Sequence, residues 1–380
     1  MSTIAADAGT VRVSDERAVA VLRTVVEIPS VSREEAACCA ALEALMRQMG
    51  YDARVDESGS VVGVIGDTSE DAREICLLGH IDTVPGHIPV RIENGVLHGR
   101  GSVDAKGSLA TFAVGAARAA LPPGVRVRVI GAVEEECATS AGARHAVGVY
   151  RPDACIIGEP SGADGITLGY KGRLLAALTV RVPMSHSAGP EPTAPELACE
   201  AWARVREAAE GLRPAGARMF DRVQARLRAT RSESDGLRDA AELSLGFRLP
   251  PGLEPNELER ACEDATRGLD GEFCWRFSGH EVAHAADRSG SVVRALCAAV
   301  RAEGLEPRLK LKTGTSDMNV VAPVWRCPIA AYGPGDSALD HAPDERLHID
   351  EYLRAIRVLT GAVERLAHEL APAAGRPSHV

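Results

Sequence analysis

The stretch "EICLLGHID", residues 74–82, carries an apolar run straight into a histidine and an aspartate. The run is short and continuously apolar, as in a strand that is covered on both faces of a sheet. His80 and Asp82 are two residues apart, so they lie on the same side of that strand. In open α/β sheets, ligands bind beyond the carboxyl ends of the strands. The stretch therefore predicts a buried strand that ends in functional polar groups.

Similar apolar runs alternate with helical patterns in the first half of the chain. Strands are predicted at "VVGVIG" (61–66), "VRVRVIGAV" (125–133) and "ACIIGE" (154–159). Apolar residues at helical spacing predict helices at "ERAVAVLRTVVEI" (16–28), "EEAACCAALEALMRQMG" (34–50) and "KGSLATFAVGAARAAL" (106–121). This alternation is typical of an α/β fold with a largely buried sheet.

The pattern changes between residues 171 and 284. The segments there predict strand, helix, strand, helix and strand: "RLLAALTVRVPM" (173–184), "APELACEAWARVREAAEGL" (194–212), "AAELSLGFRLP" (240–250), "PNELERACEDATRGL" (255–269) and "EFCWRFSG" (272–279). A unit of this size is a small α+β domain. We therefore expect a discontinuous domain, residues 1–170 and 285–380, with an α+β domain inserted at residues 171–284.

The composition narrows the class of protein. The chain has 380 residues, of which 45% are hydrophobic and 25% charged, so a sizeable core and two domains are expected. No apolar run is long enough to cross a membrane, and the first residues lack a secretory pattern, so we expect a cytoplasmic protein. The ten cysteines are scattered without a C-x-x-C pair and are expected to be reduced thiols. The net charge of −10 argues against a nucleic-acid partner.

Histidines and carboxylates gather at the predicted strand ends and in two glycine-rich loops. They are His80, Asp82, Asp104, Glu134, Glu135, Glu136, Glu159 and His341. Imidazole and carboxylate ligands suit zinc, and a two-metal site needs a bridging carboxylate with further ligands on each side. Taken singly, each residue has an ordinary structural explanation. Three consecutive acids at the end of an apolar strand, however, are not explained by solvation of a helix face.

The residues themselves predict one arrangement of ligands. His80 and Glu159 are expected to hold one metal ion, and Glu135 and His341 the other, with Asp104 between them. Glu134 is then the general base that takes a proton from the attacking water. Asp82 is expected to accept the other ring N–H of His80 and so to fix its tautomer.

Five segments resemble those that form the metal site of the dinuclear-zinc metallopeptidases and deacylases, a family that includes acetylornithine deacetylase and succinyl-diaminopimelate desuccinylase. The segments are "GHIDTVPG" (79–86), "GRGSVDAKGSLA" (99–110), "AVEEE" (132–136), "IIGEPSG" (156–162) and "GPGDSALDHAPDE" (333–345). The resemblance implies a zinc-peptidase-like three-layer catalytic domain with an inserted lid and dimerisation domain. It also implies two zinc ions, with cobalt as a possible substitute, and the same ligands, base and orienting aspartate.

The resemblance leaves one ambiguity in the acidic run. Many relatives read Asp-Glu-Glu where this chain reads Val133-Glu134-Glu135-Glu136, so the base and ligand are either Glu134 and Glu135 or Glu135 and Glu136. We prefer Glu134 and Glu135, because the apolar run then ends directly at the base.

Further residues are assigned by the resemblance alone. It implies that His186 of the lid reaches the active site of a partner subunit in a homodimer, where it steadies the oxyanion. It implies that Arg248 binds a substrate carboxylate, a role that suits its bidentate guanidinium. It also implies that the loop "KTGTSDMN" (312–319) contacts the substrate through Thr313, Gly314, Thr315 and Ser316.

Longer phrases resemble one subgroup, the hydrolases that release lysine or ornithine from the acidic amino-group carrier protein LysW. They are "GHIDTVPGHIPVRIENGVLHGRG" (79–101), "GEPSGADGITLGYKGRL" (158–174) and "LKTGTSDMNVVAPVW" (311–325). In this subgroup the enzyme cuts an amide at the γ-carboxyl of the carrier's C-terminal glutamate, and Lys171 and Arg173 become candidates for receiving the carrier. The alternatives are a deacylase of small N-acyl amino acids, a carboxypeptidase of the same family, and a non-catalytic binding protein.

Overall fold

The computed structural model describes residues 13–186, 188–213 and 218–372. The chain divides into two compact units. The first comprises residues 1–168, 286–310 and 324–380, and the second comprises residues 169–285 and 311–323. The second unit thus contains a segment, residues 311–323, that lies outside the continuous insertion expected from the sequence.

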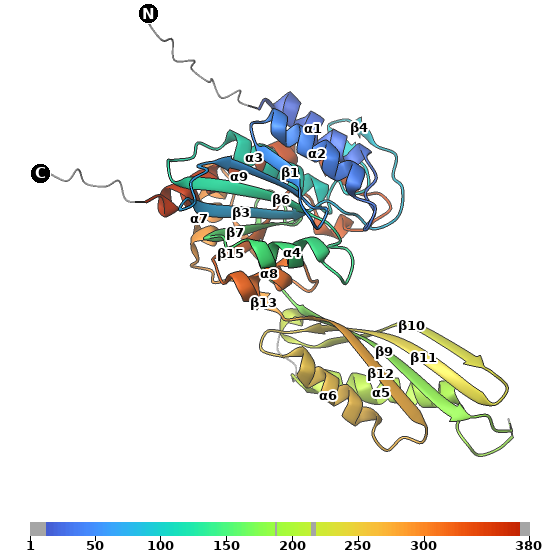
Figure 1. The fold of residues 1–380 in the computed structure, drawn as a ribbon. Helices are drawn as coiled ribbons and strands as arrows, with labels where there is room; N and C mark the ends of the chain where they lie inside the picture. Colours follow the sequence, from blue (N-terminus) through green and yellow to red (C-terminus); the bar gives the residue numbers. More distant parts are fainter. Residues whose placement is uncertain (1–12, 187, 214–217, 373–380) are drawn as a thin grey trace, which may run out of the picture. The chain divides into compact units, whose positions relative to one another are not determined.

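A nine-stranded mixed sheet forms the centre of the first unit (Figure 1). Its main path runs β1 (Asp52–Val55), β2 (Val61–Gly66), β6 (Val125–Ala132), β3 (Arg73–His80), β7 (Ala154–Gly158), β15 (Ile329–Tyr332) and β8 (Gly165–Tyr170). Two short strands pair with β8, namely β14 (Arg308–Lys312) and β13 (His284–Ala285). β6, β3, β7 and β15 are mutually parallel, whereas β2 and β8 run antiparallel to their neighbours. The apolar runs predicted as strands are confirmed as the core of this sheet.

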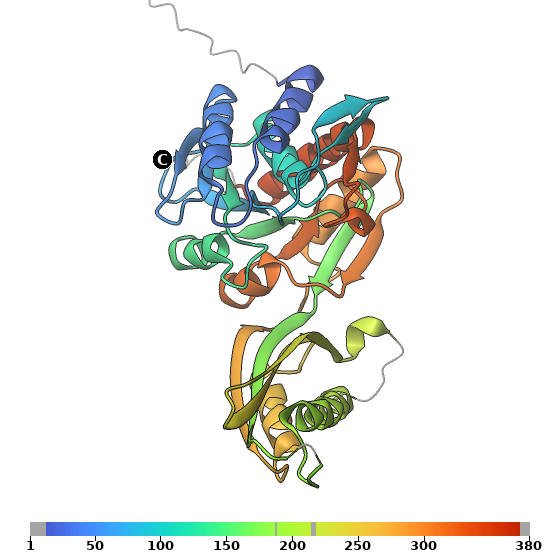
Figure 2. The ribbon, with the colours of Figure 1, turned by 90° about the vertical axis from the view of Figure 1, so that its right-hand side faces the viewer.

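Helices cover both faces of this sheet (Figure 2). They are α1 (Asp15–Glu27), α2 (Ala36–Gln48), α3 (Lys106–Arg118), α4 (Ala141–Val149), α7 (Ser291–Ala302) and α9 (Ile349–Leu370). A Cβ on Gly131 of β6 would lie 3.0 Å from Leu109 of α3. A Cβ on Gly142 of α4 would lie 2.8 Å from Ala132, the next residue of β6. Because successive strand residues face opposite sides, α3 and α4 lie on opposite faces, and the expected layered α/β architecture is confirmed.

Two smaller features complete the first unit. A three-stranded sheet pairs β16 (Arg346–His348) with β5 (Val96–His98), and β5 with β4 (Arg91–Glu93). The 3-10 turn η2 (Ser337–Leu339) follows β15 in the sequence, and helix α8 (Asp317–Trp325), which precedes β15, belongs largely to the second unit. Helix α3 is almost wholly buried, and its small residues allow a close approach, since a Cβ on Gly115 would lie only 2.8 Å from Leu359 of α9.

The second unit is a four-stranded antiparallel sheet with two helices. The strand order is β10 (Gln224–Ser234), β11 (Arg238–Leu249), β9 (Gly172–Pro183) and β12 (Glu272–Glu281). Apolar residues at alternate positions of β9 and β11 pack with α5 (Ala194–Gly211) and α6 (Pro255–Thr266) into one core. A 3-10 turn, η1 (Met219–Asp221), precedes β10. The predicted strands and helices are present in the expected order, but the structure adds a strand, β10, that the sequence analysis did not predict.

The register of the parallel strands aligns the carboxyl ends that precede the predicted site residues. His80 at the end of β3 is level with Ala132 at the end of β6. Gly79 is level with Gly158, and Gly158 with Tyr332, at the ends of β7 and β15. The residues that follow these strands therefore emerge together at one edge of the sheet.

Candidate metal centre

Five predicted or alternative metal ligands of the first unit fall into two overlapping groups. One group is His80, Glu135 and Glu136, and the other is Asp104, Glu136 and His341. Within each group, one potential ligand atom from each residue lies within 4.8 Å of the others. Glu136 and the pair His80–Asp104 connect the groups, because His80 Nε2 lies 3.4 Å from Asp104 Oδ1. The arrangement is that of two neighbouring cation sites sharing carboxylates.

The His80 ring fits a metal-binding role. The ring is 2% exposed, and its Nε2 has no hydrogen-bond partner among the described residues. Its Nδ1 lies 3.0 Å from the backbone carbonyl of Asp82 and 3.5 Å from Asp82 Oδ1. If Nδ1 carries the proton and donates it to that carbonyl, the lone pair of Nε2 points toward Asp104. A buried nitrogen without a hydrogen-bond partner is costly unless a cation binds it.

His341 lies between two carboxylates. Its Nε2 is 3.0 Å from Asp104 Oδ2 and 2.9 Å from Glu136 Oε1. Hydrogen bonds to Asp104 and Glu136 raise the pKa of His341 to about 10. Burial raises the pKa of Glu136, whereas for Asp104 the hydrogen bond from His341 and the nearby His80 ring outweigh burial and hold the pKa of that carboxyl low. Such a concentration of buried negative charge around two imidazoles is what a divalent cation would neutralise.

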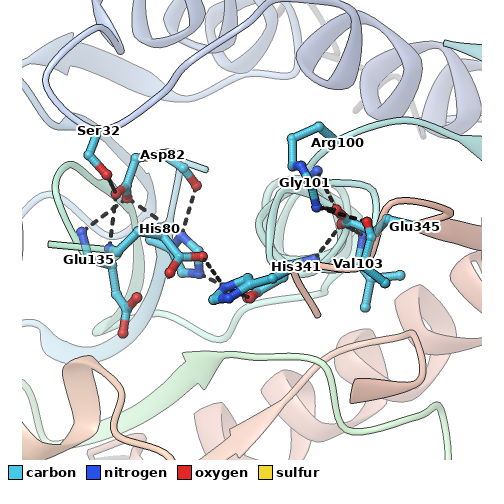
Figure 3. A network of polar contacts seen from close by, with 12 residues as sticks. Ser32, His80, Asp82, Arg100, Gly101, Val103, Glu135, His341 and Glu345 are labelled. Atoms are coloured by element: carbon cyan, nitrogen blue, oxygen red, sulfur yellow. Dashed lines mark hydrogen bonds and ion pairs between the residues drawn. The ribbon is translucent and has the colours of Figure 1, made fainter. Parts of the chain in front are cut away.

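Asp82 contacts the His80 ring and also the backbone of the acidic run. Its carboxylate accepts hydrogen bonds from the backbone N–H groups of Glu135 and Glu136, each at 3.0 Å, and from the Ser32 hydroxyl at 2.7 Å (Figure 3). The residue is fully buried. Burial opposes ionisation, but the hydrogen bonds from His80 and Ser32 lower the pKa of Asp82. The carbonyl of Asp82 is thus closer to the His80 ring than its carboxylate is, and the carboxylate holds the turn that carries the acids.

The turn also bears on which two of the three glutamates serve as base and metal ligand. Glu134 has a positive φ of 61°, so the chain reverses immediately after β6. Its side chain accepts a hydrogen bond from the Thr139 hydroxyl at 2.5 Å and lies 3.8 Å from Arg33. Glu136, two residues on, contacts His341. The geometry therefore favours the register Glu135 and Glu136, in which Glu136 lies beside His341.

Glu35 supports the same turn from another segment. Its buried carboxylate accepts hydrogen bonds from the backbone N–H of Arg33 at 2.8 Å and of Glu134 at 3.2 Å. Burial raises the pKa of Glu35. Sequence reasoning missed this residue, because it stands at the start of a predicted helix, where an acid is unremarkable.

Glu159 lies where the register predicts. It follows Gly158 at the end of β7, beside the strand that ends at His80, and it is 7% exposed. It is absent from the two compact groups defined by ligand distances among the described residues. Its assignment as a ligand therefore stays a prediction.

Glu345 joins the two loops that carry Asp104 and His341. One of its oxygens accepts from the N–H groups of Val103 at 2.8 Å and Asp104 at 3.0 Å. The other accepts from the N–H of Gly101 at 3.1 Å and from the Arg100 guanidinium at 2.8 Å (Figure 3). Glu345 has no exposed surface. Sequence reasoning missed this residue, because next to Asp344 it resembles part of a solvated acidic pair.

Two of the predicted substrate residues are in contact within the second unit. The Arg248 guanidinium donates to the Thr315 hydroxyl at 2.6 Å, so a strand arginine and the loop of Thr313 and Gly314 come together. Ser316 is buried, and its backbone N–H donates to the Asn319 side chain at 2.9 Å. The loop is therefore held by its own hydrogen bonds at the start of α8.

Two residues predicted to receive the carrier, Lys171 and Arg173, have partners within the second unit. Lys171 is fully buried, and its ammonium donates to the carbonyl oxygens of Met219 and Arg222 and to the Gln224 side chain. Arg173 forms an ion pair with the buried Glu281 at 3.0 Å. Both cations are thus engaged inside the unit, and their expected role in receiving a carrier stays a prediction. His186 lies in an exposed turn, where its Nδ1 accepts from the N–H of Ala188 at 3.1 Å.

A layered α/β fold with paired cation sites at the strand ends defines a candidate dinuclear-metal hydrolase. A family model supports this class directly, since residues 76–365 match Peptidase family M20/M25/M40. The chain belongs to this family. The expected class, a metal-dependent amide hydrolase, is confirmed.

Sequence relatives cover almost the whole chain. It is 51% identical over 353 residues to the LysW-lysine hydrolase of Deinococcus radiodurans, covering 91% of this chain and 96% of the relative. It is 39% identical over 356 residues to a putative LysW-lysine/LysW-ornithine hydrolase of Thermococcus kodakarensis, covering 93% of each chain. The resemblance inferred from the sequence is confirmed.

Solved structures show the same fold. The aminopeptidase PepT of Bacillus cereus matches with a TM-score of 0.76 and 18% identity, covering 94% of this chain and all of that one. The M20 family metallo-carboxypeptidase Sso-CP2 of Sulfolobus solfataricus matches with a TM-score of 0.75 and 19% identity, covering 93% of this chain and 99% of that one. Among the described residues, no helix combines the length and apolar character needed to cross a membrane.

Proposed function

We propose that this chain hydrolyses the amide between an amino acid and the γ-carboxyl of the C-terminal glutamate of a LysW-type carrier. Lysine, ornithine or a related diamino acid would be released in amino-acid biosynthesis. The observation that carries the proposal is the 51% identity to a LysW-lysine hydrolase over nearly the full length of both chains. A second relative named for LysW conjugates, at 39% identity over 93% of the chain, supports the same substrate class.

The donor set fits two divalent ions, and zinc is the ion we propose. His80, Glu159 and Asp104 would hold one, and Asp104, Glu136 and His341 the other. Imidazole nitrogens and carboxylate oxygens are ordinary zinc ligands. When bound, such ions polarise an amide carbonyl and acidify water. Asp82 and Glu345 would fix the loops that present these ligands.

Glu135 is the residue we propose as general base. It is grouped with His80 and Glu136, whereas Glu134 is turned toward Thr139. Asp82 fixes the backbone of Glu135. The Glu135 carboxylate would take a proton from the attacking water and deliver it to the departing amine, the two halves of general acid–base catalysis.

We also propose roles for the second unit. Arg248, in contact with Thr315, would bind a carboxylate of the substrate through a bidentate guanidinium. The loop of Thr313, Gly314 and Ser316 would line the same subsite. In a homodimer, His186 from the partner subunit would stabilise the oxyanion of the tetrahedral intermediate, as donors to developing charge do.

Three glutamine variants test the register. Glu135→Gln should retain both metal ions and lose activity by about 100-fold to 10,000-fold, the usual effect of removing a general base. Glu136→Gln should lose metal, and Glu134→Gln should stay within a few-fold of wild type. Metal content by mass spectrometry and kcat are the measurements. Loss of activity with full metal content in Glu134→Gln alone would restore the other register.

The substrate assay compares two amides with the zinc-loaded enzyme. One is a LysW-type carrier bearing lysine on its C-terminal glutamate, and the other is free N-acetylornithine. We expect a much higher kcat/KM for the carrier conjugate. Cleavage of N-acetylornithine alone would instead assign the chain to the deacylases of small N-acyl amino acids.

A further inference from the structure

In the part of the chain that the structure describes, helices α5 and α6 cover only one face of the four-stranded sheet of the second unit. Alternate residues of β9, from Leu174 to Val182, and of β11, from Ala241 to Leu249, belong to the core shared with α5 and α6. The residues between them therefore point to the opposite side of the sheet. Both helices lie on a single side of this sheet (Figure 1). We call the helix-free side, formed by the other set of alternate residues, the open face.

Three arginines converge on two neighbouring rows of the open face. In one row, Arg226 of β10 pairs with Gly246 of β11, which pairs with Leu175 of β9. In the next row, Arg276 of β12 pairs with Ala177 of β9, which pairs with Ser244. Arg228 also lies over this face, because its Cδ is 3.0 Å from the position that a Cβ on Gly246 would take.

These two rows contain no carboxylate. Ser278 completes the first row and Ala229 the second, so the floor between the arginines is made of small or uncharged residues. Apart from Leu175, the floor consists of glycine, alanine and serine, which leaves the guanidinium groups accessible, and Arg226, Arg228 and Arg276 are all exposed. We call these three residues and the floor between them the basic face.

Other arginines on the open face are paired with carboxylates, unlike the three arginines of the basic face. Arg173 pairs with Glu281 at 3.0 Å, and Arg231 pairs with Glu242 at 3.3 Å. In contrast, Arg226, Arg228 and Arg276 have no hydrogen bond or ion pair with any described residue. The chain as a whole carries a net charge of −10, so three uncompensated cations on one small area are a local departure from its charge balance.

We propose that the basic face binds an acidic surface of the carrier protein that presents the amide. This inference rests on the proposed function. The chemistry that selects the partner is the carboxylate, because arginine forks bind carboxylates in a bidentate manner and arginine is enriched in protein interfaces. The face lies wholly within the second unit, on the same side of the sheet as Arg248, two residues from Gly246 along β11.

Charge reversal tests the proposal. The double variant Arg226→Glu/Arg276→Glu is compared with Arg206→Glu/Arg260→Glu, which makes the same charge change on exposed residues of α5 and α6. Steady-state kinetics are measured on the carrier–lysine conjugate and on the free dipeptide γ-glutamyl-lysine, each from low to high salt. Sedimentation velocity follows the oligomeric state.

We expect the first variant to raise KM for the carrier conjugate at least tenfold, with kcat and the dipeptide kinetics within twofold of wild type. Its KM should also depend less on salt, because steering by opposite charges is screened. The helix-side variant should change KM less than twofold. The neutral double variant Arg226→Gln/Arg276→Gln should give an intermediate KM.

An unchanged KM for the carrier in the first variant, or an equal rise in both double variants, would overturn the proposal. A changed oligomeric state in the first variant would overturn it too, by assigning the face to contacts between copies of this chain. The wild-type kinetics distinguish a failure of the docking face from a failure of the proposed function. Failure to cleave the carrier conjugate, with cleavage of the dipeptide intact, would overturn the proposed function and the docking face with it.

Discussion

Replacing Glu345 by glutamine tests whether this buried carboxylate positions Asp104 for metal binding. The change preserves shape but converts one oxygen into an NH2 group. Each oxygen of Glu345 now accepts two hydrogen bonds, one set from Val103 and Asp104 and the other from Gly101 and Arg100. In either orientation of the amide, two donors would face an NH2 group and lose their acceptor.

The expected magnitude follows from these contacts. A buried donor left without a partner costs about 1–3 kcal/mol, and hydrogen bonds to charged groups contribute about 1.5–3 kcal/mol. With two donors affected, the loss is about 2–6 kcal/mol. Glu345 has no exposed surface, so water does not compensate. If the loop moves to find other partners, Asp104 moves with it, and each 1.4 kcal/mol then lowers metal affinity about tenfold.

The assay measures zinc affinity by competition with a chelator and unfolding by urea, both in Glu345→Gln. Glu74→Gln is the matched control, because Glu74 is also buried and accepts three hydrogen bonds from Arg126 and Arg128. It stands near the start of β3, six residues before His80, or about 20 Å along the strand. Both variants should lose stability, but only Glu345→Gln should lose zinc affinity, by at least tenfold. Equal zinc affinity in the two variants would refute a positioning role.

Three further predictions concern Asp82, His341 and Lys171. Asp82→Asn should lower zinc affinity at least tenfold, because one backbone N–H of Glu135 or Glu136 would face an amide NH2; unaltered zinc binding by calorimetry would contradict this. In the metal-free protein, the pKa of His341 near 10 keeps the ring protonated at pH 7, so zinc uptake should release protons, and its affinity should rise with pH up to about 10. Calorimetry in buffers of different ionisation enthalpy measures that release, and its absence at pH 7 would count against the raised pKa. Burial lowers the pKa of Lys171 to about 8 in the folded chain. The unfolded chain keeps the ordinary lysine pKa of about 10.4, so between these two pH values the unfolded chain binds more protons than the folded chain. The stability of wild type relative to Lys171→Met should therefore rise from pH 8 to about 10.4, as followed by urea unfolding with tryptophan fluorescence; a difference that falls or stays constant would refute it.

The sequence determined the local part of this protein. Apolar runs that end at His80 and just before Glu134 fix where the strands stop, because burial decides which residues enter the sheet. Residues after parallel strands emerge at one end of the sheet, so the strand pattern placed His80 near the acids that follow β6. The family and its hydrolase class followed from the same segments.

Only the tertiary structure decided how side chains are directed within that group. The backbone reversal at Glu134 is held by Asp82 and Glu35 from other segments, and it brings Glu136 to His341 in place of Glu135. Lys171 finds its carbonyl partners in the turn before β10, 48 residues away, so its charge is used inside the fold. Local periodicity carries no information on such contacts.

The clearest instance is Glu345, which binds the N–H of Asp104 across 241 residues of sequence. Nothing near it in the chain distinguishes it from an exposed acid, because its partners are backbone groups of a distant loop. The strand ends and the kinds of ligand were thus set by local burial and side-chain chemistry. Their orientation was set by hydrogen bonds between segments that only folding brings together.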